Sequence, residues 1–178
     1  QIQEQEAPHL LELLDQAQQN LGEHSRIRTL VLDRAYVDGP TLYKLEQQGI
    51  IWYLMAKTTM DARQTALALS TEGQPLERVV QVRHGHGRDA VVEDMRTVII
   101  PVTGIRTWNA YRPPYEEVGR LAFGERPILS AVVIKAWKNE LPDPKIGPWV
   151  LLTNGTVDEP WTLVDAYDDR SWIENGLF

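Results

Sequence analysis

Two short and almost continuously apolar runs constrain the fold of this chain more than any other feature. They are Ile27–Leu32 (IRTLVL) and Ile50–Ala56 (IIWYLMA), and their length and β-branched content are typical of buried strands. A helical pattern precedes each run, first over residues 7–22 and then from Asp38 to a stop at Gly49. The order helix, strand, helix, strand with short connections predicts an α/β layer in which helices cover a mainly parallel sheet.

The pattern changes after a third predicted helix, which begins at Asp61, with Gln64 placed to complete a capping box, and runs to about Ser70. Residues 73–148 hold most of the glycines and prolines, with strand-like runs between them. These runs are Val79–His84, Thr97–Thr103 and Ile128–Trp137. A buried strand returns at Trp149–Thr153, and a final helix starts near Asp158–Pro160. We therefore expect an α/β core made of residues 1–58 and 149–178, interrupted by a β-rich insertion at 59–148 with one helix at its start.

Composition narrows the function classes without choosing one. Of the 178 residues, 43% are apolar and 24% are charged, as in an ordinary globular protein, and the lack of cysteine excludes disulfides and thiolate metal sites. The longest apolar run, Ile128–Trp137, is too short to span a bilayer, and the first residues lack a signal-peptide pattern. We therefore expect no membrane partner and a cytoplasmic location. The net charge of −7 disfavours a general nucleic-acid binder, so a role on DNA must rest on local features.

The final predicted helix carries three side chains suited to phosphate and metal chemistry. Tyr167, Arg170 and Glu174 are spaced three and then four residues apart, which places them on one face of a helix. An arginine can hold a phosphate with two hydrogen bonds, a tyrosine can bond a phosphate oxygen, and a glutamate can bind a divalent cation. On spacing alone, the commoner interpretation is an amphipathic helix with an internal Arg170–Glu174 pair.

Asp33 is a further candidate, because it stands at the end of the first predicted strand. Side chains at such a position reach the carboxyl edge of the sheet, where α/β proteins place their ligands. An aspartate at a strand end is also common simply as a turn residue or a helix cap. Without further information, the turn or cap is the better-supported interpretation.

Together these stretches resemble a known family. Tyr167-x-x-Arg170-x-x-x-Glu174 is similar to the motif around the last catalytic glutamate of DDE transposases of bacterial insertion sequences. It matches the branch whose RNase H-like fold carries a β-rich insertion before that glutamate. The other matching stretches are Leu30–Tyr36 (LVLDRAY), similar to the strand with the family's second aspartate, Met55–Lys57 in the next strand, and Val150–Asn154 before the glutamate helix. The likeness covers roughly residues 27–58 and 149–178.

The resemblance implies an incomplete RNase H-like α/β core with a β-rich insertion, acting in DNA transposition. Asp33 and Glu174 would be the second and third catalytic acids and the metal ligands, and Tyr167 and Arg170 would bind DNA phosphate. The cofactor would be Mg²⁺, or Mn²⁺, at a two-metal site, because these hard cations take carboxylate oxygens. The partners would be transposon ends and target DNA, which the intact protein cleaves and joins by strand transfer while associated with the nucleoid.

The chain departs from the family in its first acid. The family's first aspartate lies on an opening strand, upstream of the helix that corresponds here to residues 7–22. Asp15 is the only aspartate before Asp33, and its place within that helix makes it a poor substitute. We therefore expect the chain alone to be inactive. Without the opening strands, the sheet would keep an open edge, which predicts self-association. Two alternatives stay open: a non-catalytic, DNA-binding or regulatory transposase fragment, and another nuclease with an RNase H-like fold.

Other candidates carry weaker signals. His84 and His86, with Asp89 as a third ligand, could form a metal clip, but two histidines in a glycine-rich turn are more often a plain loop. Four arginines of the insertion could meet DNA, although a solvated set is the usual interpretation, and they are Arg106, Arg112, Arg120 and Arg126. Three tryptophans are expected to pack the insertion, although the resemblance implies that one aromatic there can stack on an extruded base, and they are Trp108, Trp137 and Trp149.

Overall fold

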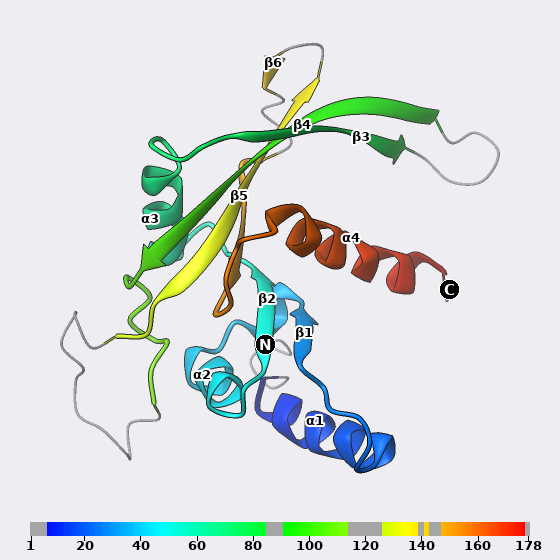
Figure 1. Cartoon of the computed structure of the whole chain (residues 1–178), viewed down its shortest axis with the longest axis vertical. Coiled ribbons are helices and arrows are strands. Elements are labelled where there is room, and N and C mark those ends of the chain that lie inside the picture. Colours follow the sequence, from blue (N-terminus) through cyan, green and yellow to red (C-terminus); the bar gives the residue numbers. More distant parts are fainter. Residues whose placement is uncertain (1–6, 85–90, 114–125, 139–140, 143–146, 177–178) are drawn as a thin grey trace.

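The computed structural model describes residues 7–84, 91–113, 126–138, 141–142 and 147–176 (Figure 1). Within these ranges, the side chains of residues 7–8, 82–84, 138, 141–142 and 171–176 lie outside the description. The elements follow in the order α1 (Ala7–Leu21), β1 (Thr29–Leu32), the 3-10 turn η2 (Arg34–Tyr36), α2 (Gly39–Gln47), β2 (Ile51–Met55), α3 (Asp61–Leu69), β3 (Leu76–His84), β4 (Val91–Ile105), β5 (Leu129–Lys138), β6 (Leu141–Pro142), β7 (Trp149–Thr153) and α4 (Pro160–Gly176).

One continuous sheet organises the described chain, in the strand order β1-β2-β7-β5-β4-β3, with β6 paired to β5. The predicted α/β class is confirmed, but the expectation of a mainly parallel sheet is wrong. Only β1 and β2 pair in parallel, and each of the other described strand pairs is antiparallel. The physical reason is that β3, β4 and β5 follow one another as a meander, which antiparallel strands can form with direct connections.

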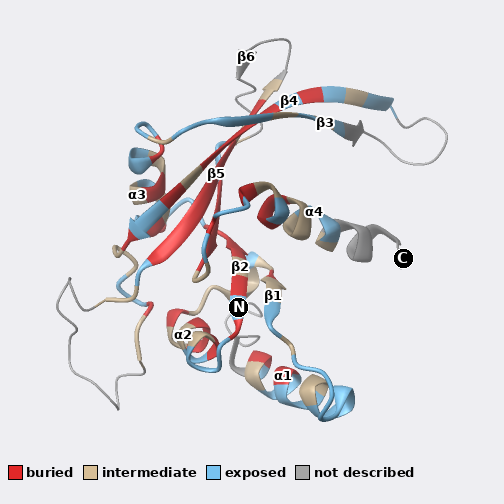
Figure 2. Ribbon diagram, in the orientation of Figure 1, coloured by how far each residue is buried: buried red, intermediate tan, exposed pale blue. Residues whose placement is uncertain are grey.

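Helices cover both faces of the sheet, and each face has its own apolar core (Figure 2). On one face α1, α2 and α3 pack through pairs of small or leucine side chains, such as Leu42 and Leu45 of α2. On the other face α4 packs through Leu163 and Val164. The strands alternate between the two cores: Leu152 of β7 belongs to the first, and its neighbour Leu151 to the second. The helix with the Tyr–Arg–Glu pattern therefore lies alone on its face among the described elements.

The helix boundaries agree closely with the sequence patterns, with one correction. Gly49 ends the α2 region with a positive φ of 73°, which a glycine adopts at little energetic cost. The capping box predicted for α3 is wrong. Met60 is the N-cap and its side chain makes no capping hydrogen bond to the helix, and the Gln64 amide instead donates to the carbonyl of Thr58. The glutamine thus binds the preceding loop rather than closing a reciprocal cap.

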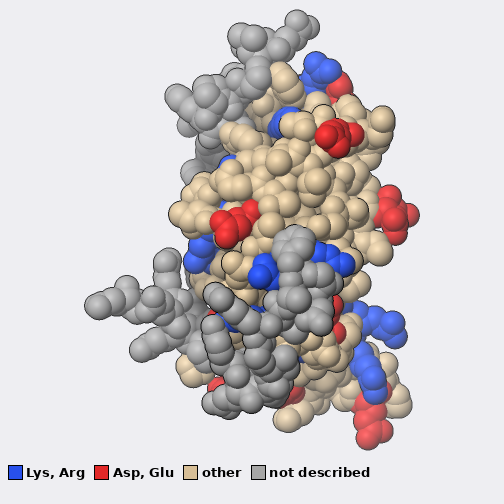
Figure 3. Space-filling view, turned by 90° about the vertical axis from the view of Figure 1, so that its left-hand side faces the viewer, with Lys and Arg blue, Asp and Glu red and all other residues tan. Residues whose placement is uncertain are grey.

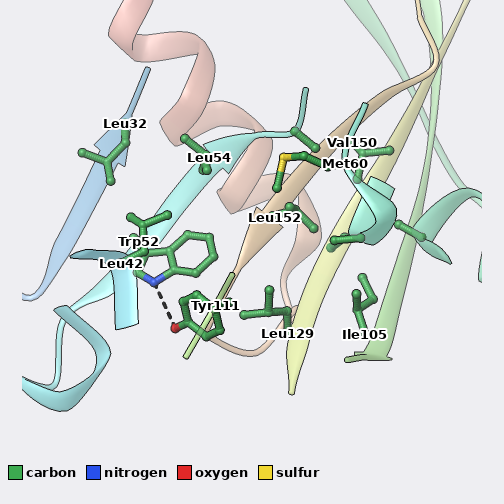
Figure 4. Close-up of a cluster of buried hydrophobic side chains, with 14 of the residues drawn as sticks. Leu32, Leu42, Trp52, Leu54, Met60, Ile105, Tyr111, Leu129, Val150 and Leu152 are labelled. Atoms are coloured by element: carbon green, nitrogen blue, oxygen red, sulfur yellow. Dashed lines mark hydrogen bonds between the residues drawn. The ribbon is translucent and has the colours of Figure 1, made fainter. Parts of the chain in front are cut away.

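A buried aromatic group ties the connection after β4 to the first part of the chain (Figure 4). Tyr111 is 2% exposed, accepts a hydrogen bond from Trp52 Nε1 at 3.3 Å and donates one to Glu46 of α2. Trp108 stacks on Tyr111, with ring centroids 5.5 Å apart. Gly39 of α2 lies directly beneath this connection, because a Cβ there would stand only 2.1 Å from the Ala110 carbonyl oxygen. We call Glu46, Trp52, Trp108 and Tyr111 the aromatic anchor.

Strand β7 joins the two halves of the sheet, since it pairs with β2 on one side and with β5 on the other. Asn154, just after β7, extends the pairing with its side chain. Its Oδ1 accepts from the Trp52 amide at 2.9 Å, and its Nδ2 donates to the Ile50 carbonyl at 3.0 Å. These two bonds satisfy backbone groups of β2 where the strand ladder stops, and they fix the point from which the chain turns toward α4.

Candidate active site

Asp33 follows β1 directly, and its carboxylate is used on both oxygens. The residue is the N-cap of η2, with φ −71° and ψ 159°, and its Oδ1 accepts the Ala35 amide at 2.9 Å. Its Oδ2 accepts from Arg170 Nη1 at 2.6 Å. The capping role that sequence alone favoured is therefore real, but it occupies one oxygen only. The second oxygen meets the arginine of the Tyr–Arg–Glu pattern, 137 residues later in the chain.

Arg170 reaches Asp33 from α4, because the helix lies across the end of β1. The Arg170 side chain is 23% exposed and the Asp33 side chain 48% exposed, so the pair lies at the rim of the molecule with one side open to solvent. The Arg170 guanidinium also stacks over the ring of Tyr167, at 5.0 Å from its centroid. Of the predicted set, Asp33, Tyr167 and Arg170 thus form one connected group.

Local charges act on Asp33 in opposite directions. Partial burial raises the pKa of the Asp33 carboxyl, whereas the Ala35 amide, the Arg170 guanidinium and the nearby Arg34 lower it, and the net result is a lowered pKa. Asp33 is therefore a carboxylate at neutral pH. Its surroundings supply positive charge from Arg34 and Arg170 and a hydrogen-bond donor from the Ala35 amide.

Glu174 lies in α4, four residues beyond Arg170, and helical geometry places the two positions on the same side of that helix. The Glu174 side chain is outside the described residues. Among the side chains that the structure does describe, no group of three acids or histidines could hold a metal ion. The hard oxygen of Asp33, at an open rim beside the helix that carries Glu174, suits Mg²⁺ or Mn²⁺ in donor type.

Sequence reasoning missed a second set of contacts on the same helix. Arg78 of β3 holds the Asp165 carboxylate with both terminal nitrogens, Nη1 to Oδ2 at 3.0 Å and Nη2 to Oδ1, and its guanidinium stacks 4.1 Å from the centroid of the Trp161 ring. Hydrogen bonding to Asp165 raises the pKa of Arg78, and Asp168 adds to the effect. Arg78 and Asp165 are 87 positions apart in the sequence, so no local pattern could reveal the pair. We call Arg78, Trp161 and Asp165 the β3 clamp.

The weaker candidates divide between packing roles and undescribed segments. Trp108 belongs to the aromatic anchor and Trp137 packs against the larger core, whereas Trp149 is 43% exposed. His86 and Asp89 of the possible metal clip lie outside the described residues, as do Arg120 and the side chain of His84. Asp15 lies on α1 and lines an open hollow beside Gly22 and Arg26.

Two of the four candidate arginines, Arg106 and Arg126, serve the local fold. Arg106 donates to the carbonyl of Arg126, and Arg126 donates to Asn109, so both tie the two sides of the 106–126 connection. Figure 3 shows the face on the α3 side of the molecule, where the described Lys and Arg side chains are interspersed with Asp and Glu. No broad basic field is visible on the described part of that face.

A family model described as a transposase DDE domain matches residues 3–177. No curated protein matches the chain. Within the described residues, no helix is long and apolar enough to cross a membrane.

Proposed function

The chain belongs to the transposase DDE domain family and has its RNase H-like fold, and from this premise we propose that Asp33 and Glu174 are two of the metal-binding catalytic acids. The family places the chain in DNA transposition. We propose that Tyr167 and Arg170 contact phosphate, and that the intact protein cleaves transposon ends and transfers strands with Mg²⁺ or Mn²⁺. Residues 1–58 and 149–178 would form the core and 59–148 the insertion. The protein would act in the cytoplasm, at the nucleoid.

The observation that carries the proposal is the hydrogen bond between Asp33 and Arg170. It brings the acid at the end of β1 and the helix of the Tyr–Arg–Glu pattern to one rim of the sheet, at 2.6 Å. A helix-packing or capping role alone needs no such contact, since the Ala35 amide already satisfies the cap. The grouping of a carboxylate, a guanidinium and a phenol at a solvent-open rim supports the handling of a phosphodiester.

The chain's own residues divide the work in this proposal. Bound divalent ions would activate the attacking hydroxyl or water and stabilise the leaving oxygen. The Asp33 and Glu174 carboxylates would bind these ions. Arg170 exchanges the Asp33 oxygen for a phosphate oxygen when DNA arrives, since a guanidinium can bond either anion. The Tyr167 ring stacks against the Arg170 guanidinium and holds it in position.

The proposal is tested in the protein expressed from its full reading frame, on duplex DNA that carries the end of the element. Asp33→Asn and Glu174→Gln should each abolish Mg²⁺-dependent nicking and leave end binding largely intact. Asp15→Asn is the matched control and should nick normally, because Asp15 lies on α1 beside a different hollow. Nicking by either site variant, or its loss in the control, would contradict the assignment of the acids.

A second candidate function, pairing with other copies as a non-catalytic regulator, is favoured by the edge of the sheet. In the described chain β1 pairs with β2 only, so its other edge offers free backbone groups to an added strand. Light scattering at rising protein concentration tests this candidate. A dimer that dissociates when Val31→Pro removes an edge amide would support it, and a monomer at all concentrations would count against it.

A further inference from the structure

Helix α4 is held from two sides by two polar groups of different origin. Near its start, the β3 clamp joins Asp165 and Trp161 to Arg78 of the hairpin β3–β4. Farther along, Arg170 joins the helix to Asp33 after β1. Figure 1 shows α4 running beneath the hairpin and away from the centre of the sheet. Its described apolar anchors, Leu163 and Val164, both lie in the first part of the helix.

The geometry of the clamp restricts rotation of the helix about its own axis. Trp161 and Asp165 are four residues apart and so share one face of α4. Arg78 meets both at once, with a planar fork on the carboxylate and a flat stack on the indole. The hydrogen bonds to the carboxylate and the stack on the indole each require a particular orientation of the guanidinium plane. Together they restrict rotation of the helix about its axis more than apolar packing alone would.

The clamp contributes little to overall stability, because both partners are partly open to solvent. The Arg78 side chain is 37% exposed and that of Asp165 is 49% exposed. Ion pairs of this kind are screened and add little to the free energy of unfolding. Their specific geometry is therefore the more important property. A rotation of α4 would carry Arg170 away from Asp33, since both contacts belong to the same rigid helix.

We propose that Arg78 is a positioning residue for the candidate active site: its grip on Asp165 and Trp161 sets the rotation of α4 and thereby places Arg170 on Asp33. The hairpin that carries Arg78 lies within residues 59–148, so this region orients the glutamate helix of the core. The part of the inference that concerns catalysis rests on the proposed function. The mechanical part, from Arg78 to Arg170, stands on the contacts alone.

A side-chain NMR signal provides a direct readout in the chain as it is. The Nε–H group of Arg170 should give a ¹⁵N-resolved signal displaced from those of exposed arginines, identified by its disappearance in Arg170→Lys. In Arg78→Met, which keeps an unbranched apolar side chain but loses the guanidinium and its charge, this signal should move to the position of an exposed arginine. Asp165→Asn should reproduce the shift, and Arg78→Lys should produce a smaller one, because lysine keeps the charge and loses the fork.

The matched control is Arg96→Met. Arg96 also holds a carboxylate with two nitrogens, that of Glu77, but strand alternation puts this pair on the opposite face of the same hairpin. The Arg170 signal should stay in place in this variant, and the melting temperatures of both variants should remain within about 4 °C of the parent. An unmoved Arg170 signal in Arg78→Met and Asp165→Asn, or an equal shift in Arg96→Met, would overturn the proposal.

Titration with Mn²⁺ of the protein expressed from its full reading frame separates the inference from the function on which it rests. Paramagnetic broadening of signals from Asp33 and its neighbours would support a metal site at this rim. If the ion causes no broadening there while Arg78→Met still moves the Arg170 signal, the proposed metal chemistry fails and the positioning by Arg78 stands.

Discussion

Besides the pairing of β5 with β7, two side-chain groups connect residues 59–148 to the rest of the described molecule, and these two attachments differ in kind. The aromatic anchor is buried: Trp52 is fully enclosed, and the Tyr111 hydroxyl accepts a hydrogen bond from Trp52 and donates one to Glu46. The β3 clamp is half open to water and rests on a charged pair. Burial of aromatic rings stabilises by several kcal/mol, whereas an exposed ion pair contributes roughly 0–1 kcal/mol. The first attachment therefore fixes where the strands lie, and the second adjusts a helix that carries the candidate chemistry.

The largest expected effect tests the buried side of this comparison. Trp52→Ala should lower the free energy of unfolding by about 3–5 kcal/mol, because it empties the centre of the aromatic anchor. Urea denaturation measures the loss. Trp149→Ala is the control, since Trp149 is 43% exposed and should cost about 1 kcal/mol or less. Equal losses in the two variants would contradict the larger contribution of the aromatic anchor to the free energy of unfolding.

The next effect concerns backbone packing beneath the anchor. Gly39→Ala should destabilise the protein by about 1–3 kcal/mol, because the added Cβ would stand 2.1 Å from the Ala110 carbonyl oxygen, which belongs to the backbone and must shift as a whole. Gly155→Ala serves as the comparison, since its Cβ would meet a terminal side-chain carbon of Ile51 at 3.0 Å. Thermal unfolding of both variants decides: a milder loss at Gly39 than at Gly155 would contradict the close contact.

A smaller and more specific change removes one oxygen from the anchor. Tyr111→Phe should cost about 1–3 kcal/mol, because Trp52 Nε1 and the Glu46 carboxylate both lose their bond to the hydroxyl. Tyr53→Phe, which removes a hydroxyl from a half-buried ring in the other core, should stay within about 0.5 kcal/mol. Burial, and after it the Glu46 carboxylate, raises the pKa of Tyr111, so absorbance at alkaline pH should show this phenol ionising above the ordinary value of 10.0.

The smallest effect belongs to the exposed side and depends on pH. The Asp33 carboxyl has a lowered pKa in the folded state, so its pair with Arg170 stabilises above the ordinary value of 3.8 and loses this contribution as pH falls through the folded pKa. Arg170→Met should therefore cost less than about 1 kcal/mol near neutral pH, and the difference from the parent should vanish in acid. Urea denaturation across this range measures it. A difference that persists in acid, or in an Asp33→Asn background, would assign it to packing.

The sequence predicted the elements well because their signals are local. The apolar runs at 27–32, 50–56 and 149–153 all became strands, and Gly49 closed its helix as glycine does. The prediction of a mainly parallel sheet was wrong. The arrangement of the strands depends on β7 lying between β2 and β5, and no local sequence pattern indicates this position. The spacing of Tyr167 and Arg170 correctly indicated a shared side of α4, and the structure adds that Arg170 meets Asp33.

Contacts between distant residues set the limit of sequence reasoning. Asp33 could be read as a cap or as an active-site acid, and the structure shows a cap on one oxygen and an arginine on the other. Arg78 stood just before the predicted strand run Val79–His84 with nothing to mark it, since its partner lies 87 residues away. No local sequence pattern marked Tyr111 as a structural residue either, because its hydrogen-bond partners, Trp52 and Glu46, lie on other elements.

The central place of β7 has a consequence for how the molecule is made. This strand is the last of the described strands in sequence, yet it separates β2 from β5 in the sheet. During synthesis, β1–β2 and β3–β5 emerge first as two incomplete pieces, each with an unsatisfied edge, and neither can be closed by residues already made. Long-range pairing of this kind slows folding. If translation stalls before residue 149, the nascent chain therefore exposes the unpaired edges of both β2 and β5. Such chains should depend on chaperones until β7 emerges.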